Sequence, residues 1–172
     1  MRNSFYLFIS LIIYSCSLNP NKAPLEYELP TVKHDLGYIP FDSNIDDEGF
    51  TVCDSTNINS GRNRLQYTGG SDQLRADIRA NYQSNTAYAD FSGYVVIRFI
   101  VNCNGKSGRY RAQSLNLDFS PSKENPDLLK NSITLIQDLD QWVKSPKYDD
   151  QTEYSKFINL KIDHGQLQHV LL

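Results

Sequence analysis

The sequence has few of the residues from which enzyme and metal sites are usually built. Its 172 residues include three histidines, three cysteines and one tryptophan. His34 stands alone, and His164 and His169 are five apart, where we expect solvated side chains rather than a metal pair. Nucleophilic catalysis needs a serine or cysteine beside a histidine and an orienting carboxylate, and the sequence contains no nucleophile-elbow motif. We therefore expect no enzyme activity, no cofactor and no metal site.

An excess of positive charge is also lacking. The chain has 17 Lys and Arg against 20 Asp and Glu, a formal net charge of −3. Binding to nucleic acid depends on cations that neutralise phosphates, so we expect no nucleic-acid partner. With 40% hydrophobic residues the chain can bury one ordinary core, and it is too short for two comfortable domains.

The N-terminal apolar run is too short to span a bilayer as a mature helix. Phe5–Tyr14 follows the basic Arg2, which is the pattern of a signal peptide. The small Ser15 directly before Cys16 resembles the lipobox of bacterial lipoproteins, in which cleavage leaves the cysteine as the lipidated N-terminus. We expect a signal peptide over residues 1–15 and lipid on Cys16. The alternative is an ordinary secretory signal that is cut nearby.

Two cysteines remain once Cys16 carries lipid. An oxidising envelope favours a disulfide between Cys53 and Cys103. Tetrahedral zinc is the competing interpretation, but it needs further Cys or His at short spacing, and neither cysteine has one. We expect a disulfide that ties Phe50–Cys53 to a hairpin turn at Asn104-Gly105.

The segment between the lipid and the domain is polar and rich in proline. Residues 16–47 show no sustained period of 2 or 3.6, so we expect a flexible tether that leads to a domain over residues 48–172. The stretch "DSNIDDEG", Asp42 to Gly49, has the alternating acidic and amide side chains of a calcium loop. However, Asp47 replaces the turn glycine and Cys53 takes the position of the bidentate glutamate, so we expect a solvated acidic turn.

Two later segments have the periodicity of amphipathic helices. In the first, Leu74, Ile78 and Tyr82 recur at helical spacing after the break at residues 69–72. The second begins at a capping asparagine followed by proline, and we expect it to continue past Trp142 until Ser145-Pro146 ends it. The expected buried side chains of this second helix are Leu129, Ile133, Ile136 and Leu139.

The strand pattern predicts a small sheet. Residues 94–101 and 109–117 alternate as a hairpin, 154–163 as a final strand, and His164-Gly165 can turn that strand into another over Leu167–Leu171. The order helix, hairpin, helix, strand predicts an α+β fold with two helices on one face of a small antiparallel sheet.

The hairpin register depends on its turn. A strict two-residue turn at Asn104-Gly105 would place Arg98 opposite Arg111, a repulsive like-charge pair. We expect a three-residue turn with Gly105 in the left-handed region and a bulge, which avoids that pair.

Four stretches follow one another in a recognisable order. They are "YTGGSDQLRADIRANY", "GYVVIRFIVNCNGKSGRY", the helix ending in "LDQWVKSPKY", and "FINLKI". Together they cover residues 67–162 and resemble the TonB C-terminal domain family. The resemblance implies a periplasmic α+β module that binds a strand-forming segment of an outer-membrane transporter by edge-strand pairing. The docking edge that it implies is Phe157, Ile158, Asn159, Leu160 and Lys161 of the final strand.

These patterns predict a non-enzymatic envelope lipoprotein that binds a protein partner. Ser17 is not the aspartate that retains lipoproteins at the inner membrane, so we expect the periplasmic face of the outer membrane. The chain has no retained transmembrane helix and no long Pro/Lys-rich spacer, which argues against energy transduction. A strand over Leu167–Leu171 that pairs with the final strand would block the expected docking edge.

A glycan-binding surface is the alternative function. Tyr148 and Tyr154 near Trp142 could bind peptidoglycan or another envelope polysaccharide. The competing interpretation of Trp142 is a buried side chain that packs the helix against the sheet.

Overall fold

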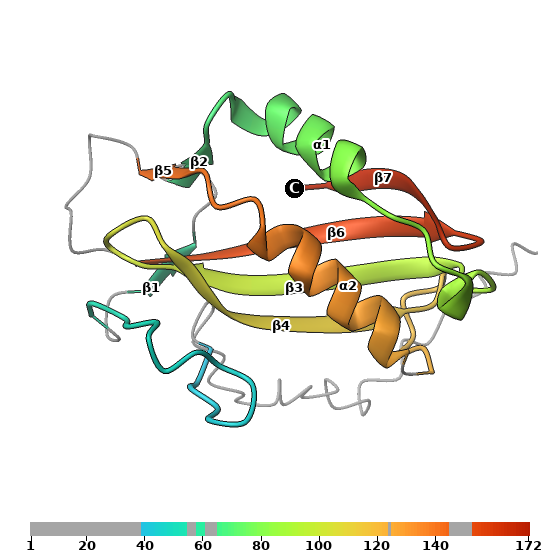
Figure 1. Cartoon of the computed structure of the whole chain (residues 1–172), viewed down its shortest axis with the longest axis horizontal. Coiled ribbons are helices and arrows are strands. Elements are labelled where there is room, and N and C mark those ends of the chain that lie inside the picture. Colours follow the sequence, from blue (N-terminus) through green and yellow to red (C-terminus); the bar gives the residue numbers. More distant parts are fainter. Residues whose placement is uncertain (1–38, 55–57, 61–64, 124, 145–152) are drawn as a thin grey trace, which may run out of the picture. The chain divides into compact units, whose positions relative to one another are not determined.

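The computed structural model describes most of the chain beyond its N-terminal region. The described residues are 39–54, 58–60, 65–123, 125–144 and 153–172 (Figure 1). The expected signal peptide, Cys16 and most of the expected tether lie outside them. In the described part of the chain, no helix is both long and apolar enough to cross a membrane.

The main sheet has five strands. β4 (Ser107–Leu115) forms one edge, and β3 (Gly93–Val101) and β6 (Glu153–Asp163) are central. β1 (Ile58–Ser60) and β7 (Gln166–Leu171) both pair with the outer side of β6, β1 in parallel and β7 antiparallel. A separate two-stranded sheet joins β2 (Leu65–Tyr67) to β5 (Trp142–Lys144).

Two helices cover one face of the main sheet. α1 (Gly70–Asn81) and α2 (Pro126–Gln137) lie over that face, and a short 3₁₀ helix, η1 (Thr86–Tyr88), precedes β3 (Figure 1). The predicted α+β fold, with its helix-hairpin-helix-strand order and its last strand β7, is therefore confirmed.

The core lies between this face and the helices. A strand presents alternate side chains to the same face, so β3 and β6 each contribute one buried row. Burying each large apolar side chain contributes about 1.5–3 kcal/mol. The members with no exposed surface are Val95, Ile97, Phe99 and Val101 of β3, Tyr154, Ile158, Leu160 and Ile162 of β6, Ile78 of α1, and Leu128 and Ile136 of α2.

The second helix is shorter than its sequence predicts. α2 ends at Gln137 rather than near Ser145, and Trp142 belongs to strand β5. Asp138 and Asp140 follow the last turn, where negative charge meets the negative end of the helix dipole. As part of a strand, the ring of Trp142 packs against Phe99 in the core, with centroids 5.2 Å apart.

The expected inward side chains of α2 also need correction. Ile136 and Leu139 are buried as predicted, but Leu129 and Ile133 are only partly buried. Leu128, Ser132 and Leu135 face the core in their place. The helix is therefore rotated slightly relative to the prediction, which leaves Leu129 and Ile133 partly exposed beside β4.

The hairpin has the expected turn but not the expected pairing. The amide of Asn102 donates to the carbonyl of Lys106, and Gly105 is left-handed with φ of 79°, which makes the three-residue turn. A bulge at Arg109, whose φ is 52°, adds one residue to β4 and restores the pairing of Arg98 with Arg111. The prediction that this pair is avoided was wrong.

The N-terminal strap, residues 39–54, packs on the domain. Ile39 is only 3% exposed, although it lies in the expected flexible tether. A Cβ on Gly108 would lie 2.4 Å from the Phe50 ring, so the strap requires glycine at that point of β4. Among the described residues, the packed part of the chain therefore begins at Ile39, before residue 48.

Candidate functional site

The docking edge expected on the final strand is largely occupied. At Asn159, Leu160 and Lys161, β6 pairs with β3 on one side and with β7 on the other. Of the five expected residues, only Phe157 and Ile158 lie between the stretches that pair with β1 and β7. The expected edge is therefore wrong over Asn159–Lys161, because β7 folds back and satisfies the backbone of β6.

Two of the three aromatic side chains of the glycan alternative are buried and do not contribute to a surface. Trp142 is 6% exposed and Tyr154 is fully buried, both within the core, and Tyr148 lies outside the described residues. The interpretation of Trp142 as a packed core side chain is confirmed. His164 and His169 are exposed, and His164 contacts the carboxylate of Asp163 at 3.0 Å.

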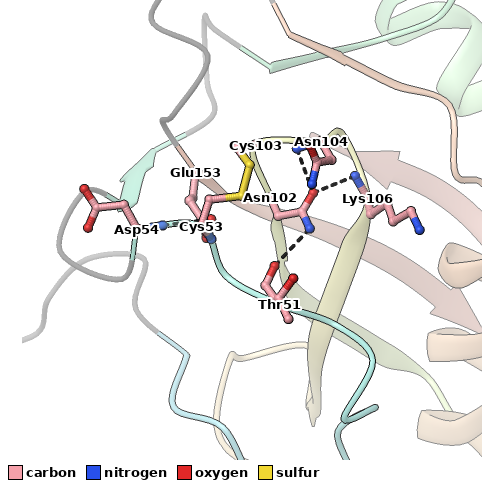
Figure 2. The surroundings of a disulfide bond; sticks show 8 residues. All are labelled: Thr51, Cys53, Asp54, Asn102, Cys103, Asn104, Lys106 and Glu153. Carbon is pink, nitrogen blue, oxygen red and sulfur yellow. Dashed lines mark hydrogen bonds between the residues drawn. A yellow bond between two sulfur atoms is a disulfide. The ribbon is translucent and has the colours of Figure 1, made fainter.

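The predicted disulfide is present. Cys53 in the strap is bonded to Cys103 in the hairpin turn, with their Cα atoms 6.0 Å apart. Figure 2 shows the carboxylate of Glu153 beside the bond, where it accepts hydrogen bonds from the amides of Cys53 and Asp54. Burial raises the pKa of the Glu153 carboxyl above its usual value, and those two amides oppose the rise.

Asn102 joins the same two segments without the disulfide. Its Oδ1 accepts from the amides of Asn104 and Lys106, and its Nδ2 donates to the carbonyl of Thr51 at 3.0 Å (Figure 2). Asn102 is only 2% exposed, so these bonds are shielded from water. Sequence reasoning missed this residue because its partner lies in the strap.

β4 is one of the open strand edges of the described sheet; the outer sides of β1 and β7, which pair only with β6, are others. β4 pairs with β3 alone, except at its end, where the amide of Ser122 donates to the carbonyl of Ser114. The outward-facing backbone groups of a strand recur every second residue, so the N–H and C=O of Ala112 also point away from β3. No described residue forms a backbone hydrogen bond with this N–H or this C=O of Ala112.

A groove of 610 Å³ lies along this edge. Leu129, Ile133 and Gln137 of α2 form one wall, and Lys106 with Ser107–Ala112 of β4 forms the floor. The other wall comes from five strap residues, Ile45, Asp46, Asp47, Gly49 and Phe50. In Figure 1, α2 crosses β4, and the strap runs along the outer side of β4. We call this the β4 groove.

One ion pair and two hydrogen bonds engage four of the charged side chains around the β4 groove. Arg111 binds Asp46, whose pKa lies below its usual value because of the hydrogen bonds from that guanidinium. Arg109 donates to the carbonyl of Ile39 at 2.9 Å. Asp140 accepts from the hydroxyl of Ser107. The remaining lining is mainly apolar, which suits an uncharged extended segment better than a strongly charged one.

Comparison with known proteins adds no relative. No protein-family model, no curated protein and no solved structure matches the chain.

Sequence reasoning missed the β4 groove because its walls come from residues far apart in the chain. The sequence did contain one signal for the groove. With Leu129 and Ile133, α2 has more apolar side chains than its core-facing side can bury.

Proposed function

We propose that this chain is a non-enzymatic binding domain of the TonB C-terminal type, carried on an envelope lipoprotein. In this proposal it binds an extended segment of an outer-membrane protein as an added strand. The strand pairs with β4 in the β4 groove, rather than with β6.

The open backbone of Ala112 is the observation that carries the proposal. An added strand draws its affinity from main-chain hydrogen bonds, so it needs an edge whose N–H and C=O groups are free. In the described part of β6 those groups are paired at Asn159–Lys161, whereas at Ala112 they face the groove. Each backbone bond to a partner would contribute about 0.5–1.5 kcal/mol net.

The walls of the groove support the same mode of binding. The side chains of an added strand point alternately to the two faces of the sheet. One set would contact Leu129 and Ile133 of α2, and the other would contact Phe50 of the strap. The floor from Lys106 to Ala112 is long enough for a segment of roughly 20 Å at about 3.3 Å per residue.

Site-specific photocrosslinking in intact envelopes tests this proposal. A photoreactive side chain at Gln137, on the groove wall, is compared with the same side chain at Gln168, which is exposed on β7. We expect one outer-membrane protein to be captured from position 137 and not from position 168. Equal capture from both positions, or capture of peptidoglycan fragments alone, would contradict the groove; the second result would favour glycan binding.

A matched pair of substitutions sharpens the test. Ile133→Glu places a carboxylate on the apolar wall, and Leu117→Glu places one on an exposed apolar side chain outside the groove. We expect Ile133→Glu to weaken capture at least tenfold, about 1.4 kcal/mol of binding free energy, and Leu117→Glu to leave it unchanged. Similar capture by both variants argues against the proposal.

A further inference from the structure

Three potential metal ligands meet where the strap, the hairpin turn and β6 converge. Cys53, Cys103 and Glu153 each offer one ligand atom, and these atoms all lie within 4.8 Å of one another. The antiparallel pairing of Val101 with Tyr154 brings the start of β6 beside the hairpin turn. The sequence does not reveal the group, because Glu153 lies fifty residues beyond Cys103.

The carboxylate of Glu153 is incompletely used in the oxidised protein. Glu153 has no exposed surface, and its Oε1 accepts from the amides of Cys53 and Asp54. Its Oε2 is buried and has no hydrogen-bond partner in the described structure. A buried carboxylate oxygen without a partner is costly, and a cation held beside the sulfurs would satisfy it.

Reduction would free the two sulfurs without releasing the segments that carry them. The bond from Asn102 Nδ2 to the carbonyl of Thr51 joins strap and turn independently of the disulfide. Tetrahedral zinc with Zn–S bonds of about 2.3 Å holds two sulfurs about 3.8 Å apart. Cysteines whose Cα atoms are 6.0 Å apart reach that separation by side-chain rotation.

We propose that the reduced form of this protein binds one Zn²⁺ ion through Cys53 Sγ, Cys103 Sγ and the carboxylate of Glu153. A water molecule takes the fourth position, and the exposed side of Cys53 gives the ion access. Two thiolates select zinc over magnesium and calcium, which prefer sites made only of oxygen.

The disulfide becomes the zinc-bound form in two steps, a two-electron reduction and then metal binding. A dithiol reductant gives two electrons and two protons and becomes a disulfide, while the Sγ–Sγ bond breaks and two thiols form. Zn²⁺ then displaces both thiol protons to solvent. Reoxidation by a disulfide of higher potential releases the ion.

Metal titration of the full chain tests the proposal. The chain carries Cys16→Ser, so that only two thiols respond, and is reduced with a water-soluble phosphine, which becomes the phosphine oxide. Co²⁺ serves as a spectroscopic probe, and Zn²⁺ affinity is measured against a chromogenic chelator. We expect one equivalent of Co²⁺ with a thiolate-to-cobalt absorption band, displaced by Zn²⁺, and no binding by the oxidised protein.

Variants separate this site from simple capture by two thiols. We expect Cys103→Ser to lose Zn²⁺ affinity at least 100-fold, and Glu153→Gln to lose it at least tenfold with two free thiols still present. Glu48→Gln, at an exposed strap residue outside the group, is the matched control and should bind normally. Unchanged affinity of Glu153→Gln, the absence of the cobalt band, or two chains per metal ion would overturn the proposal.

X-ray absorption of the zinc-loaded chain gives a readout that does not depend on the folding of Glu153→Gln. We expect two sulfur neighbours at about 2.3 Å and two oxygen neighbours at about 2.0 Å. Four sulfur neighbours would show bridging between chains and would refute the site.

Discussion

Arg111 donates two parallel hydrogen bonds to Asp46, from Nη1 to Oδ1 at 2.7 Å and from Nη2 to Oδ2 at 2.8 Å. The Asp46 side chain is only 2% exposed and is shielded from water, whereas the Arg111 side chain is 28% exposed. The carboxylate neutralises Arg111, which the sheet register places opposite Arg98. The strap thereby removes the repulsion that the hairpin alone would suffer.

Loss of the Asp46 charge should destabilise the protein. Asp46→Asn leaves the guanidinium of Arg111 without its counter-charge, opposite Arg98. We expect a loss of about 2 kcal/mol of unfolding free energy, below the 3–5 kcal/mol of a fully buried pair because Arg111 is partly exposed. Urea unfolding measures it. Asp47→Asn is the control, since the Asp47 side chain only accepts from the amide of Gly49; equal losses would contradict the role of Asp46.

The same pair makes stability depend on acid pH. The folded-state pKa of Asp46 lies below the ordinary value of 3.8, mainly because of the hydrogen bonds from Arg111. A lowered pKa contributes stability that is complete above the unfolded-state pKa and is lost as pH falls through the folded-state pKa. We expect the stability difference between the wild type and Asp46→Asn to be constant above about pH 5 and to shrink towards about pH 2. A difference that grows on acidification would reverse the sign and refute the assignment.

Removal of the disulfide should lower stability while the fold persists. The bond joins residues 50 apart, and closing a loop of that length contributes about 4 kcal/mol in the chain-entropy model. The core rows of β3 and β6 do not depend on it. We expect Cys53→Ser/Cys103→Ser to unfold at a lower denaturant midpoint with an unchanged circular dichroism spectrum. Labelling of the denatured, non-reduced wild type should find both thiols blocked; reactive thiols at Cys53 and Cys103 would contradict the bond.

Trp142 should report on the core. It is the only tryptophan, it is 6% exposed, and it packs on Phe99 and Tyr67. We expect blue-shifted fluorescence that acrylamide quenches weakly and that shifts to the red on unfolding. Trp142→Ala should cost about 3–5 kcal/mol, because it leaves a cavity. Strong quenching in the folded protein, together with a shift on adding peptidoglycan fragments, would restore the glycan interpretation.

The lipid anchor is tested at Cys16. If cleavage after Ser15 leaves Cys16 lipidated, Cys16→Ser should move the protein from the membrane fraction to the soluble periplasm. Mass spectrometry of the wild-type N-terminal peptide should find acyl chains. Continued membrane association of the variant, with no acyl mass on the wild type, would exclude the lipoprotein interpretation.

The sequence by itself determined the elements whose signals are local. The alternation in 94–101 and 154–163 and the helical spacing of Leu74 and Ile78 were enough to place β3, β6 and α1. A strand or helix that buries one face must repeat its apolar residues at the period of its own backbone. The disulfide also followed from the sequence, because counting cysteines left a single pair.

Only the tertiary structure decided the features that join distant residues. α2 ends at Gln137 because Trp142 is better buried as part of β5, on Phe99, than in a continued helix. The pairing of Arg98 with Arg111 is tolerated because Asp46, from the strap, neutralises one partner. Neither outcome can be derived from the hairpin or from the helix alone.

The two candidate sites have the same origin. The β4 edge is open and the β6 edge is largely closed because β7 pairs with β6 and not with β4. Glu153 meets Cys53 and Cys103 because β6 pairs with β3 beside the hairpin turn. Periodicity determines which face of an element is buried, but strand order and register determine which edges stay open and which side chains meet, because they depend on the packing of the whole chain.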